Sequence, residues 1–317
     1  MAEAKGPTTK IWRDGTLVDW ADATIHVMSH VVHYGSCVFE GIRAYATPSG
    51  GAVFRLEDHI RRLHDSAKIY RLPLRHSIDA LCQATVDTIA ANELAQCYIR
   101  PLVMRAGATM GIWNPDIPVE TFIICWESAA PYLGHEAPEK GVDVCVSTWR
   151  RAAPNTFPAL AKAGGNYLNA QLGKLEAKQN GYIEAIMLDT AGFVSEGTGE
   201  NLFLVKNGEL ITAPLSASIL GGITRDSVVR IASDFGIPVR EMEIPRELLY
   251  IVDEAFFCGT AVEVTPVRSI DRLPVGSGLP GPLTKKIQER FLSVAKGRSP
   301  DTHGWLTPVP VAAAVGK

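Results

Sequence analysis

The spacing of apolar residues predicts short strands and two amphipathic helices in the first half of the chain. Between residues 56 and 67, apolar side chains recur at i, i+4, i+7 and i+11, on one face of a helix. Arg61 and Arg62 fall on or beside its polar flank. One of them could reach a phosphate, but the pattern alone predicts both in water. Ser77 is a typical N-cap for the second helix. Strands are expected in a hairpin around Asp14-Gly15 and over 37–45, 98–104 and 121–126.

The second half predicts strands and helices in alternation. Three leucines between 168 and 175 define a helix that ends at Asn180-Gly181. Further strands are expected over 142–148, 183–188, 201–205 and 255–258, and further helices after Gly222 and over 283–295. The tail from Pro308 onward is expected to be loose.

The length of the chain favours two domains. At 317 residues it exceeds the size at which a single hydrophobic core usually stops growing. The segment from Ser128 to Gly141 is rich in proline and glycine and is the best linker candidate. We therefore predict a small N-terminal domain over 1–130, a linker over 131–141 and a larger C-terminal domain over 142–317.

Composition narrows the class of protein. Hydrophobic residues make up 46% and charged residues 21%, which is typical of a soluble globular enzyme. The net charge of -3, without a block of lysine or arginine, gives no sign of binding to nucleic acid or a membrane surface. No apolar run approaches a membrane span, and the six scattered cysteines indicate reduced thiols. We expect a cytoplasmic enzyme.

Three histidines near the N-terminus raise the question of a metal site. His26, His30 and His33 follow one another at helix-like spacings. No carboxylate or cysteine nearby completes a credible set of ligands. We therefore predict no metal ion.

The candidate chemistry centres on Lys162, in the segment Pro158-Ala-Leu-Ala-Lys162-Ala-Gly-Gly-Asn-Tyr167. Apolar surroundings disfavour the charged form of a lysine and lower its pKa. A neutral amine can react with a carbonyl, as the lysines of pyridoxal 5'-phosphate (PLP) enzymes do. A solvated loop lysine is the plain alternative, so the rest of the sequence has to decide.

Three downstream segments would suit the same cofactor. Glu196 could pair with a protonated pyridine nitrogen and keep the ring an electron sink. Gly222-Ile223-Thr224 offers backbone N–H groups and a hydroxyl at a helix N-terminus, which suits a phosphate, and Gly259-Thr260-Ala261 offers a second such turn. Each segment is weak evidence alone, because glycine turns before helices are usually caps. Together, and in this order, they indicate PLP.

Two predicted strands each place an arginine beside aromatic residues. By alternation, one strand has on one face Phe39, Gly41, Arg43 and Tyr45. The other has Tyr98 and Arg100 on one face. The plain alternative is a surface arginine, but such a residue does not need aromatic neighbours on its face of the strand. The functional interpretation is that each arginine contacts the carboxylate of a ligand beside an apolar pocket.

Longer motifs carry a resemblance to a known family. The main signature is Glu196-Gly-Thr-Gly-Glu-Asn201-Leu-Phe203, followed by Leu220-Gly-Gly-Ile-Thr-Arg225. Others are Val38-Phe-Glu-Gly-Ile-Arg43, Tyr98-Ile-Arg-Pro101, Ala161-Lys-Ala-Gly-Gly-Asn-Tyr167 and Gly259-Thr-Ala261. With these motifs the chain, from about Ile11 to Trp305, resembles the class IV aminotransferases, which are fold type IV PLP enzymes. Within them it is most similar to the bacterial branched-chain amino-acid aminotransferases.

The resemblance implies a fold, a reaction and an assembly. The fold would have two domains, a small α+β N-terminal domain and a larger α/β pseudo-barrel C-terminal domain that binds PLP. The reaction would be transamination of branched-chain L-amino acids (leucine, isoleucine, valine) with 2-oxoglutarate, giving 2-oxo acids and L-glutamate. The assembly would be at least a homodimer, with a hexamer as the alternative.

The resemblance also implies roles for individual residues. Lys162 would be the catalytic residue and would hold the aldehyde of PLP. The other cofactor-binding residues would be Arg62, Tyr167, Glu196, Gly222, Ile223, Thr224 and Thr260. The substrate-binding residues would be Tyr34 (from the neighbouring subunit), Phe39, Gly41, Arg43, Tyr98, Arg100, Tyr132, Thr260 and Ala261.

Two departures from the family pattern leave the substrate preference open. Many relatives have proline where Gly221 stands, and Trp113 adds a bulky residue to a loop that in relatives lies near the substrate. The alternatives with the same fold are a D-amino-acid or (R)-amine aminotransferase and an aminodeoxychorismate lyase. A small-molecule-binding protein without catalysis is an alternative of another class, which the intact Lys162 and Glu196 disfavour.

Overall fold

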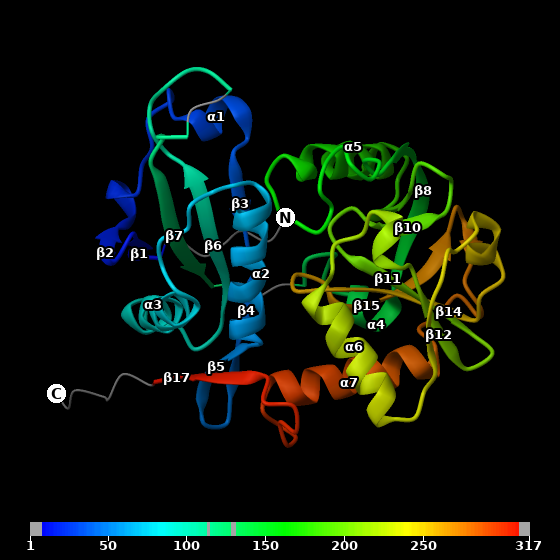
Figure 1. Ribbon diagram of the computed structural model, residues 1–317. Coiled ribbons are helices and arrows are strands. Elements are labelled where there is room, and N and C mark those ends of the chain that lie inside the picture. The colour runs from blue at the N-terminus through cyan, green and yellow to red at the C-terminus, as the bar shows by residue number, and fades with distance from the viewer. Residues whose placement is uncertain (1–7, 113–114, 128–130, 311–317) are drawn as a thin grey trace. The chain divides into compact units, whose positions relative to one another are not determined.

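The computed structural model describes residues 8–112, 115–127 and 131–310, which divide into two units (Figure 1). Unit 1 takes the described residues up to 127, Ala161–Gly165 and those from Ser293 onward. Unit 2 takes residues 131–160 and Asn166–Leu292. The units differ from the predicted ranges 1–130 and 142–317, because the short segment with Lys162 and the C-terminal strand are grouped with unit 1.

Unit 1 is built on a sheet whose described strands pair antiparallel in the order β17-β5-β4-β6-β7-β1-β2, with β3 beside β6. The strands are β1 Lys10–Arg13, β2 Thr16–Asp19, β3 Cys37–Phe39, β4 Ile42–Thr47, β5 Gly50–Phe54, β6 Cys97–Arg105, β7 Val119–Trp126 and β17 Leu306–Val309. The helices are η1 Trp20–Asp22, α1 His30–Tyr34, α2 Leu56–Ile69 and α3 Ile78–Ala91. Helix α2 packs against β3, and α3 packs against β1 and β7 (Figure 1).

The predicted helices of unit 1 are present for the reasons that their sequences suggest. Leu56, Ile60 and Leu63 of α2 are buried in the core between helix and sheet. The hydroxyl of Ser77 accepts a hydrogen bond from the N–H of Ala80 at 3.2 Å, so the expected N-cap of α3 is present. Apolar periodicity and capping therefore suffice to locate these two helices.

The predicted strand over 37–45 is interrupted in the middle. Strand β3 ends at Phe39 and β4 begins at Ile42, so Glu40 and Gly41 lie between them. The N–H of Glu40 donates to the C=O of Pro101 at 2.8 Å, and its side chain is buried. Alternation of side chains could not reveal this break, because the cause is a charged side chain that turns inward.

The tail that was expected to be loose contains a strand. Strand β17 pairs antiparallel with β5, and Val309 and the preceding Trp305 are buried. β17 is the edge strand of this sheet in the described residues, next to β5. Proline has no backbone N–H to donate to a neighbouring strand, so it is tolerated on an edge strand, as at Pro308. The prediction of a loose tail is wrong for Pro308 and Val309, because a proline-rich sequence also suits an edge strand. The rest of the predicted tail, over 311–317, lies outside the described residues.

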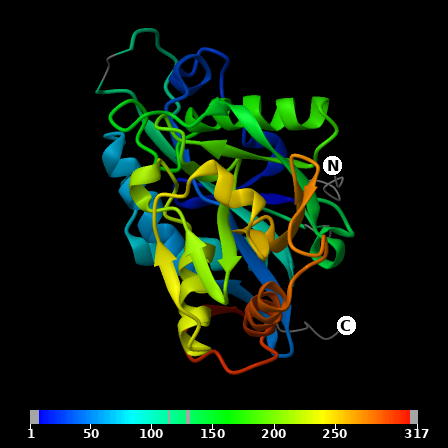
Figure 2. The same cartoon turned by 90° about the vertical axis from the view of Figure 1, so that its right-hand side faces the viewer.

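Unit 2 contains a mixed sheet in the order β10-β9-β8-β15-β14-β11-β12-β13, with β16 beside β15. Strands of this unit are seen in Figure 2 in green, yellow and orange. Strand β8 pairs in parallel with β9 and β15, and β12 pairs in parallel with β13. The strands are β8 Val142–Arg150, β9 Glu184–Leu188, β10 Val194–Gly197, β11 Asn201–Lys206, β12 Glu209–Thr212, β13 Val239–Glu241, β14 Glu254–Gly259, β15 Glu263–Ile270 and β16 Leu273–Pro274. The helices are α4 Ala137–Lys140, α5 Asn166–Gln179, η2 Leu215–Ala217, α6 Ile223–Asp234, η3 Arg246–Tyr250 and α7 Pro282–Ala295, which runs past the end of unit 2.

Helix α5 is present where the leucines predicted it, but those leucines do not face the sheet. Leu168, Leu172 and Leu175 are exposed, while the face toward β8 and β9 carries small residues. A Cβ on Gly173 would lie 3.3 Å from the sulfur of Met187 and 3.4 Å from the hydroxyl of Ser147. The helix backbone therefore approaches the sheet too closely for large side chains at this position.

Part of the segment predicted as a linker is folded into unit 2. Leu133 and Ala137 are buried in the main core of this unit. Helix α4 packs against β15. Gly141, with a φ of 74°, then leads into β8, and the carbonyl oxygen of Pro266 would lie 3.1 Å from a Cβ placed on it. Within the described residues, this stretch is an integral part of the unit.

Candidate active site

Lys162 is fixed in unit 1 through its backbone. Its N–H donates to the hydroxyl of Ser66 on α2 at 3.0 Å, and its C=O accepts from the N–H of Phe39 at 2.9 Å. Ala163 forms an isolated bridge with Val38. The amine nitrogen lies 5.1 Å from the centroid of the Phe39 ring, and the residue is half-buried. The lysine therefore lies in the partly apolar setting that the sequence predicts.

The two adjacent arginines of α2 have different environments. Arg61 pairs with Glu57 and its side chain is 58% exposed. Arg62 is only 14% exposed and donates from Nε and Nη2 to the carboxylate of Glu40 at 2.7 and 2.9 Å. Successive helix positions point about 100° apart, so one arginine faces water and the other faces the sheet. The expectation that both are solvated is wrong for Arg62.

Arg100 lies among aromatic rings in unit 1. Its guanidinium carbon is 4.5 Å from the ring centroid of Phe39 and 5.8 Å from that of Trp126, and Nη2 donates to the hydroxyl of Tyr98 at 3.0 Å. Its Nε is buried without a hydrogen-bond acceptor among the described residues. A bound carboxylate would satisfy this donor. Trp126 was missed from the sequence, since only the register of β6 against β7 pairs it with Tyr98.

Gly41 is required by a close approach. A Cβ at this position would lie 2.1 Å from the hydroxyl oxygen of Tyr98, so any side chain would displace that ring. Arg43, two residues on, lies with its guanidinium carbon 5.9 Å from the Tyr45 ring. The predicted cluster of aromatic and cationic side chains is therefore present within unit 1.

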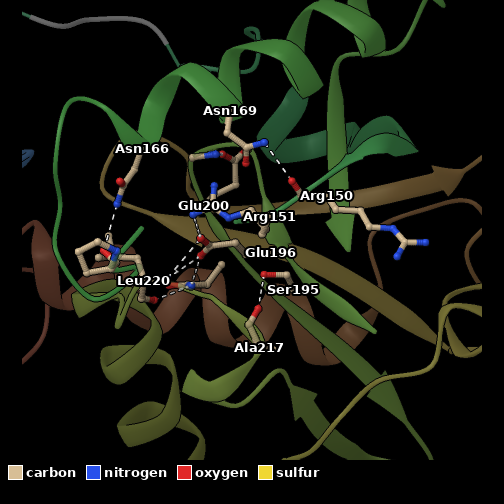
Figure 3. A network of polar contacts seen from close by, with 12 residues as sticks. Arg150, Arg151, Asn166, Asn169, Ser195, Glu196, Glu200, Ala217 and Leu220 are labelled. Carbon is tan, nitrogen blue, oxygen red and sulfur yellow. Dashed lines mark hydrogen bonds and ion pairs between the residues drawn. The ribbon is translucent and has the colours of Figure 1, made fainter. Parts of the chain in front are cut away.

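Glu196 lies in unit 2 on strand β10, buried and surrounded by donors (Figure 3). Nη2 of Arg151 lies 2.9 Å from Oε1, and Nδ2 of Asn201 donates to Oε2 at 2.8 Å. The N–H of Leu220 adds contacts of 3.2 and 3.3 Å. These partners surround a buried anion with the hydrogen bonds that it needs. Neither Arg151 nor Asn201 was among the predicted site residues, although Asn201 is part of the signature motif.

Asn201 links Glu196 to the start of helix α6. Besides Glu196 it donates to the C=O of Leu220 at 2.9 Å, and a Cβ on Gly222 would lie 1.9 Å from its side-chain oxygen. Gly222 is the N-cap residue of α6, and the N-terminus of a helix is the end that favours an anion. Gly221, in contrast, has room for a side chain, since among the described residues an added Cβ would meet Leu215 alone, at 3.8 Å.

The remaining predicted residues are distributed over both units. Thr260 and Ala261 form the turn between β14 and β15, Tyr167 is in the first turn of α5, and Tyr132 is exposed. Tyr34 is exposed on α1, where its hydroxyl accepts from the N–H of Gly111 at 3.1 Å. Trp113 lies outside the described residues. Within unit 1 the structure brings together Phe39, Gly41, Arg62, Tyr98, Arg100 and Lys162, and within unit 2 Glu196, Gly222, Ile223 and Thr224.

A pair of buried carboxyl groups in unit 2 was not predicted. Glu184 accepts from the hydroxyl of Thr198 at 2.7 Å and pairs with Lys174. Glu200 accepts from the N–H of Gly199 at 2.6 Å. Burial, and then the charge of Glu184, raise the pKa of Glu200 well above its usual value. Glu200 therefore keeps its proton to a higher pH in the native state than an ordinary glutamate does.

Replacing Glu200 by glutamine is expected to make the protein more stable at high pH. The native state keeps the Glu200 proton, whereas the unfolded chain releases it above the ordinary pKa of a glutamate. The free energy of unfolding that this group contributes therefore falls as pH rises. The gain in melting temperature of Glu200→Gln should be near zero at about pH 4 and positive at about pH 8. A gain that is the same at both pH values would contradict the assignment.

The comparisons with known proteins identify the family. A model of the family "Amino-transferase class IV" matches residues 37–270. The chain belongs to the class IV aminotransferases. Within this family it is similar to the branched-chain-amino-acid aminotransferase of Escherichia coli (strain K12), with 52% identity over 302 residues, 94% of this chain and 97% of the relative.

Solved structures of class IV aminotransferases have the same fold. The crystal structure of the Escherichia coli branched-chain amino acid aminotransferase matches with a TM-score of 0.94 at 50% identity, covering 96% of this chain and 100% of that one. The branched-chain amino acid aminotransferase from Thermobaculum terrenum in its PLP-bound form matches with a TM-score of 0.89 at 36% identity, covering 96% and 99%. The predicted family and fold class are confirmed.

The structure also bears on the three early histidines and on membrane-spanning helices. Among the described residues, no three His, Cys, Asp or Glu side chains gather as a metal site. His30, one of the three early histidines, instead contacts the hydroxyl of Ser36 at 2.7 Å and the C=O of Gly111 at 3.2 Å. In the same part of the chain, no helix has the length and apolar character needed to cross a membrane.

Proposed function

We propose that the protein is a PLP-dependent aminotransferase that moves the amino group of leucine, isoleucine or valine to 2-oxoglutarate. The names of its relatives and the bound cofactor of one of their structures support this assignment. The observation that carries it is the buried carboxylate of Glu196 with its three donors. An anion fixed in this way suits the protonated nitrogen of the PLP ring.

The residues present in each unit fit PLP. When bound, PLP supplies an aldehyde for the amino group and a ring that accepts electrons from the substrate Cα. Lys162 would hold the aldehyde, Glu196 the ring nitrogen and Tyr167 the phenolic oxygen. The phosphate would be bound by Arg62, Gly222, Ile223, Thr224 and Thr260.

Lys162 would also move the proton on which the reaction depends. A neutral amine is the form that accepts a proton, and the amine nitrogen of Lys162 lies 5.1 Å from the centroid of the Phe39 ring. The amine nitrogen would take the proton from Cα of the amino donor. In the second half of the reaction, which runs backwards with 2-oxoglutarate, it would return a proton to Cα of the glutamate that forms. The fixed backbone of Lys162 limits the movement of the side chain to its own rotatable bonds.

Substrate recognition would use the cluster of unit 1 and the turn at Thr260-Ala261. Arg100 and Tyr98 would bind the α-carboxylate, since Arg100 has a buried N–H without an acceptor in the described residues. Arg43 would bind the second carboxylate of 2-oxoglutarate. Apolar side chains of the substrate would lie against Phe39 and Tyr132, and against Tyr34 of the neighbouring subunit.

Gly41→Ala is expected to lower kcat/KM for leucine by about tenfold or more, because it displaces the Tyr98 hydroxyl and with it Arg100. Steady-state kinetics measure the effect. The matched control removes the obstacle: in a Tyr98→Phe background, Gly41→Ala should cause a much smaller further loss. An equal loss in both backgrounds would show that Tyr98 is not what the glycine accommodates.

We infer that the enzyme is at least a homodimer. A surface of unit 1 around Tyr34 carries exposed apolar residues, of which Ile112 is 85% exposed; the others are Val27, Val32 and Met110. Hydrogen bonds join Gly111 to Tyr34 and His33 to Val27, so these exposed residues belong to neighbouring segments. Exposed apolar residues gathered in this way are typical of a subunit interface. Light scattering should give a mass of at least twice that of one chain.

The unpaired state of the six cysteines supports a cytoplasmic location.

Assays with different amino donors test the proposed function. With 2-oxoglutarate as acceptor, L-leucine, L-isoleucine and L-valine should be converted to 2-oxo acids, with equal amounts of L-glutamate formed. D-alanine and an (R)-amine should react at least about 100-fold more slowly. Turnover of D-alanine or of the (R)-amine in place of L-leucine would favour the alternatives with the same fold, and binding of PLP without any turnover would favour a binding protein.

A further inference from the structure

Glu40 is a fully buried carboxylate to which the proposed chemistry gives no role. Its side chain is 0% exposed, and it stands at the break between β3 and β4. Its backbone is held by the hydrogen bond to Pro101. A buried charge is costly unless it is paired and hydrogen-bonded, so the partners of Glu40 indicate what it does.

Arg62 is the main partner of Glu40. Its Nε donates to Oε1 at 2.7 Å and its Nη2 to Oε2 at 2.9 Å, a parallel pair of bonds between two planar groups. The N–H of Gly41 adds a contact of 3.3 Å to Oε2. A guanidinium carries its five donors in one rigid plane. Two bonds to Glu40 therefore fix the direction of the other three donors.

His59 lies on the other side of the carboxylate. Its Nδ1 is 2.7 Å from Oε2 of Glu40. Burial lowers the pKa of His59, and the nearby cations Arg62 and Lys162 oppose the raising effect of Glu40. The ring is neutral at neutral pH, so Nδ1 carries the hydrogen and donates it to the carboxylate.

Glu40 stays ionised in this setting. Burial alone would raise its pKa, but Arg62 and His59 together hold the pKa well below the usual value of a glutamate. The carboxylate is thus a permanent anion near neutral pH. Since His59 is neutral, the charge of Glu40 is balanced by Arg62 alone within this trio.

The same helix face also holds the catalytic lysine. His59, Arg62 and Ser66 are spaced i, i+3 and i+7 on α2, so they lie on one face. Ser66 accepts the hydrogen bond from the N–H of Lys162. The residue proposed to bind the cofactor phosphate and the residue proposed to bind its aldehyde are therefore both anchored on one face of one helix.

We propose that Glu40, supported by His59, is a positioning residue that orients Arg62 to bind the phosphate of PLP. This inference rests on the proposed role of Arg62 toward the cofactor. Without the anion, Arg62 would sample several rotamers, and ordering it would weaken phosphate binding. Glu40 itself touches neither substrate nor cofactor in this proposal.

The comparison of PLP with pyridoxal, which lacks the phosphate, tests the inference. In the full-length protein freed of cofactor, Glu40→Gln should raise the dissociation constant of PLP about 10- to 100-fold and that of pyridoxal less than about twofold. The matched control is Glu57→Gln, which breaks the exposed pair with Arg61 on the same helix and should change neither constant. An equal loss for both ligands would mean general damage and would overturn the proposal.

A second background shows whether Glu40 acts through Arg62. In Arg62→Met, PLP binding should already be weak, and adding Glu40→Gln should weaken it less than about twofold further. A full additional loss in this background would mean that Glu40 acts by another route and would overturn the inference.

His59 variants keep the test possible if Glu40→Gln does not fold. Asparagine at position 59 keeps an N–H near the place of Nδ1, whereas leucine does not. His59→Asn should keep the ratio of PLP to pyridoxal affinity within about twofold of the native ratio, and His59→Leu should lower it about fivefold or more. Native ratios in both variants would overturn the inference, while a native protein that binds neither ligand would overturn the proposed function instead.

Discussion

Lys162→Ala is expected to reduce transamination by at least about 10³-fold, because it removes both the amine that holds the PLP aldehyde and the base that takes the substrate proton. The backbone contacts of position 162 with Ser66 and Phe39 use only main-chain atoms of the lysine. They remain in the variant, so the fold of unit 1 should persist. Single-turnover and steady-state assays with L-leucine measure the loss.

The control for this variant is Lys140→Ala. Lys140 forms an exposed i,i+4 pair with Glu136, and such pairs contribute little. The activity and melting temperature of the Lys140→Ala variant should match those of the native protein. Some noncovalent binding of PLP should survive in Lys162→Ala through the other cofactor-binding residues. Turnover by Lys162→Ala within about tenfold of the native rate would refute the catalytic role.

Glu196→Gln is expected to lower kcat by about 10²- to 10³-fold, since a neutral amide cannot keep the ring nitrogen of PLP protonated. The side chains are nearly equal in size, so Asn201 and Leu220 keep a hydrogen-bonding partner. Arg151, however, loses its buried counter-charge. We therefore also expect a loss of about 3 to 5 kcal/mol in the free energy of unfolding.

The two effects of Glu196→Gln can be separated. Arg151→Met removes the ion-pair partner of Glu196 but leaves its carboxylate, so this variant should lose stability while its kcat falls much less. Kinetics at saturating PLP and chemical unfolding of the cofactor-free protein give the two quantities. A kcat of Glu196→Gln within about twofold of the native value would rule out the role of the carboxylate.

The sequence was sufficient where one local pattern decides the structure. The apolar stripe of α2, the Ser77 cap and the glycine turn before α6 predicted their elements without any knowledge of contacts. The motifs around Lys162 and Glu196 predicted the family. Such features are set by neighbours along the chain, which periodicity and capping describe directly.

Features set by residues distant in the sequence were not predictable in this way. Glu40 and Arg62 are 22 positions apart, and only the packing of α2 on β3 brings them together. Trp126 joins the Tyr98 cluster only through the register of β6 and β7. The buried pair of Glu184 and Glu200 likewise depends on tertiary packing. From the sequence alone, charged residues at these positions are predicted to be exposed at the surface.

The most direct test of the central claim is to identify the lysine that binds PLP. Treating the purified protein with PLP and then with sodium borohydride fixes the covalent bond between lysine and cofactor, and mass spectrometry of the digested protein locates it. The account predicts a modified peptide that contains Lys162, with no modification after prior incubation with L-leucine, because the substrate amine displaces the lysine. Modification of a different lysine, or of none, would contradict it.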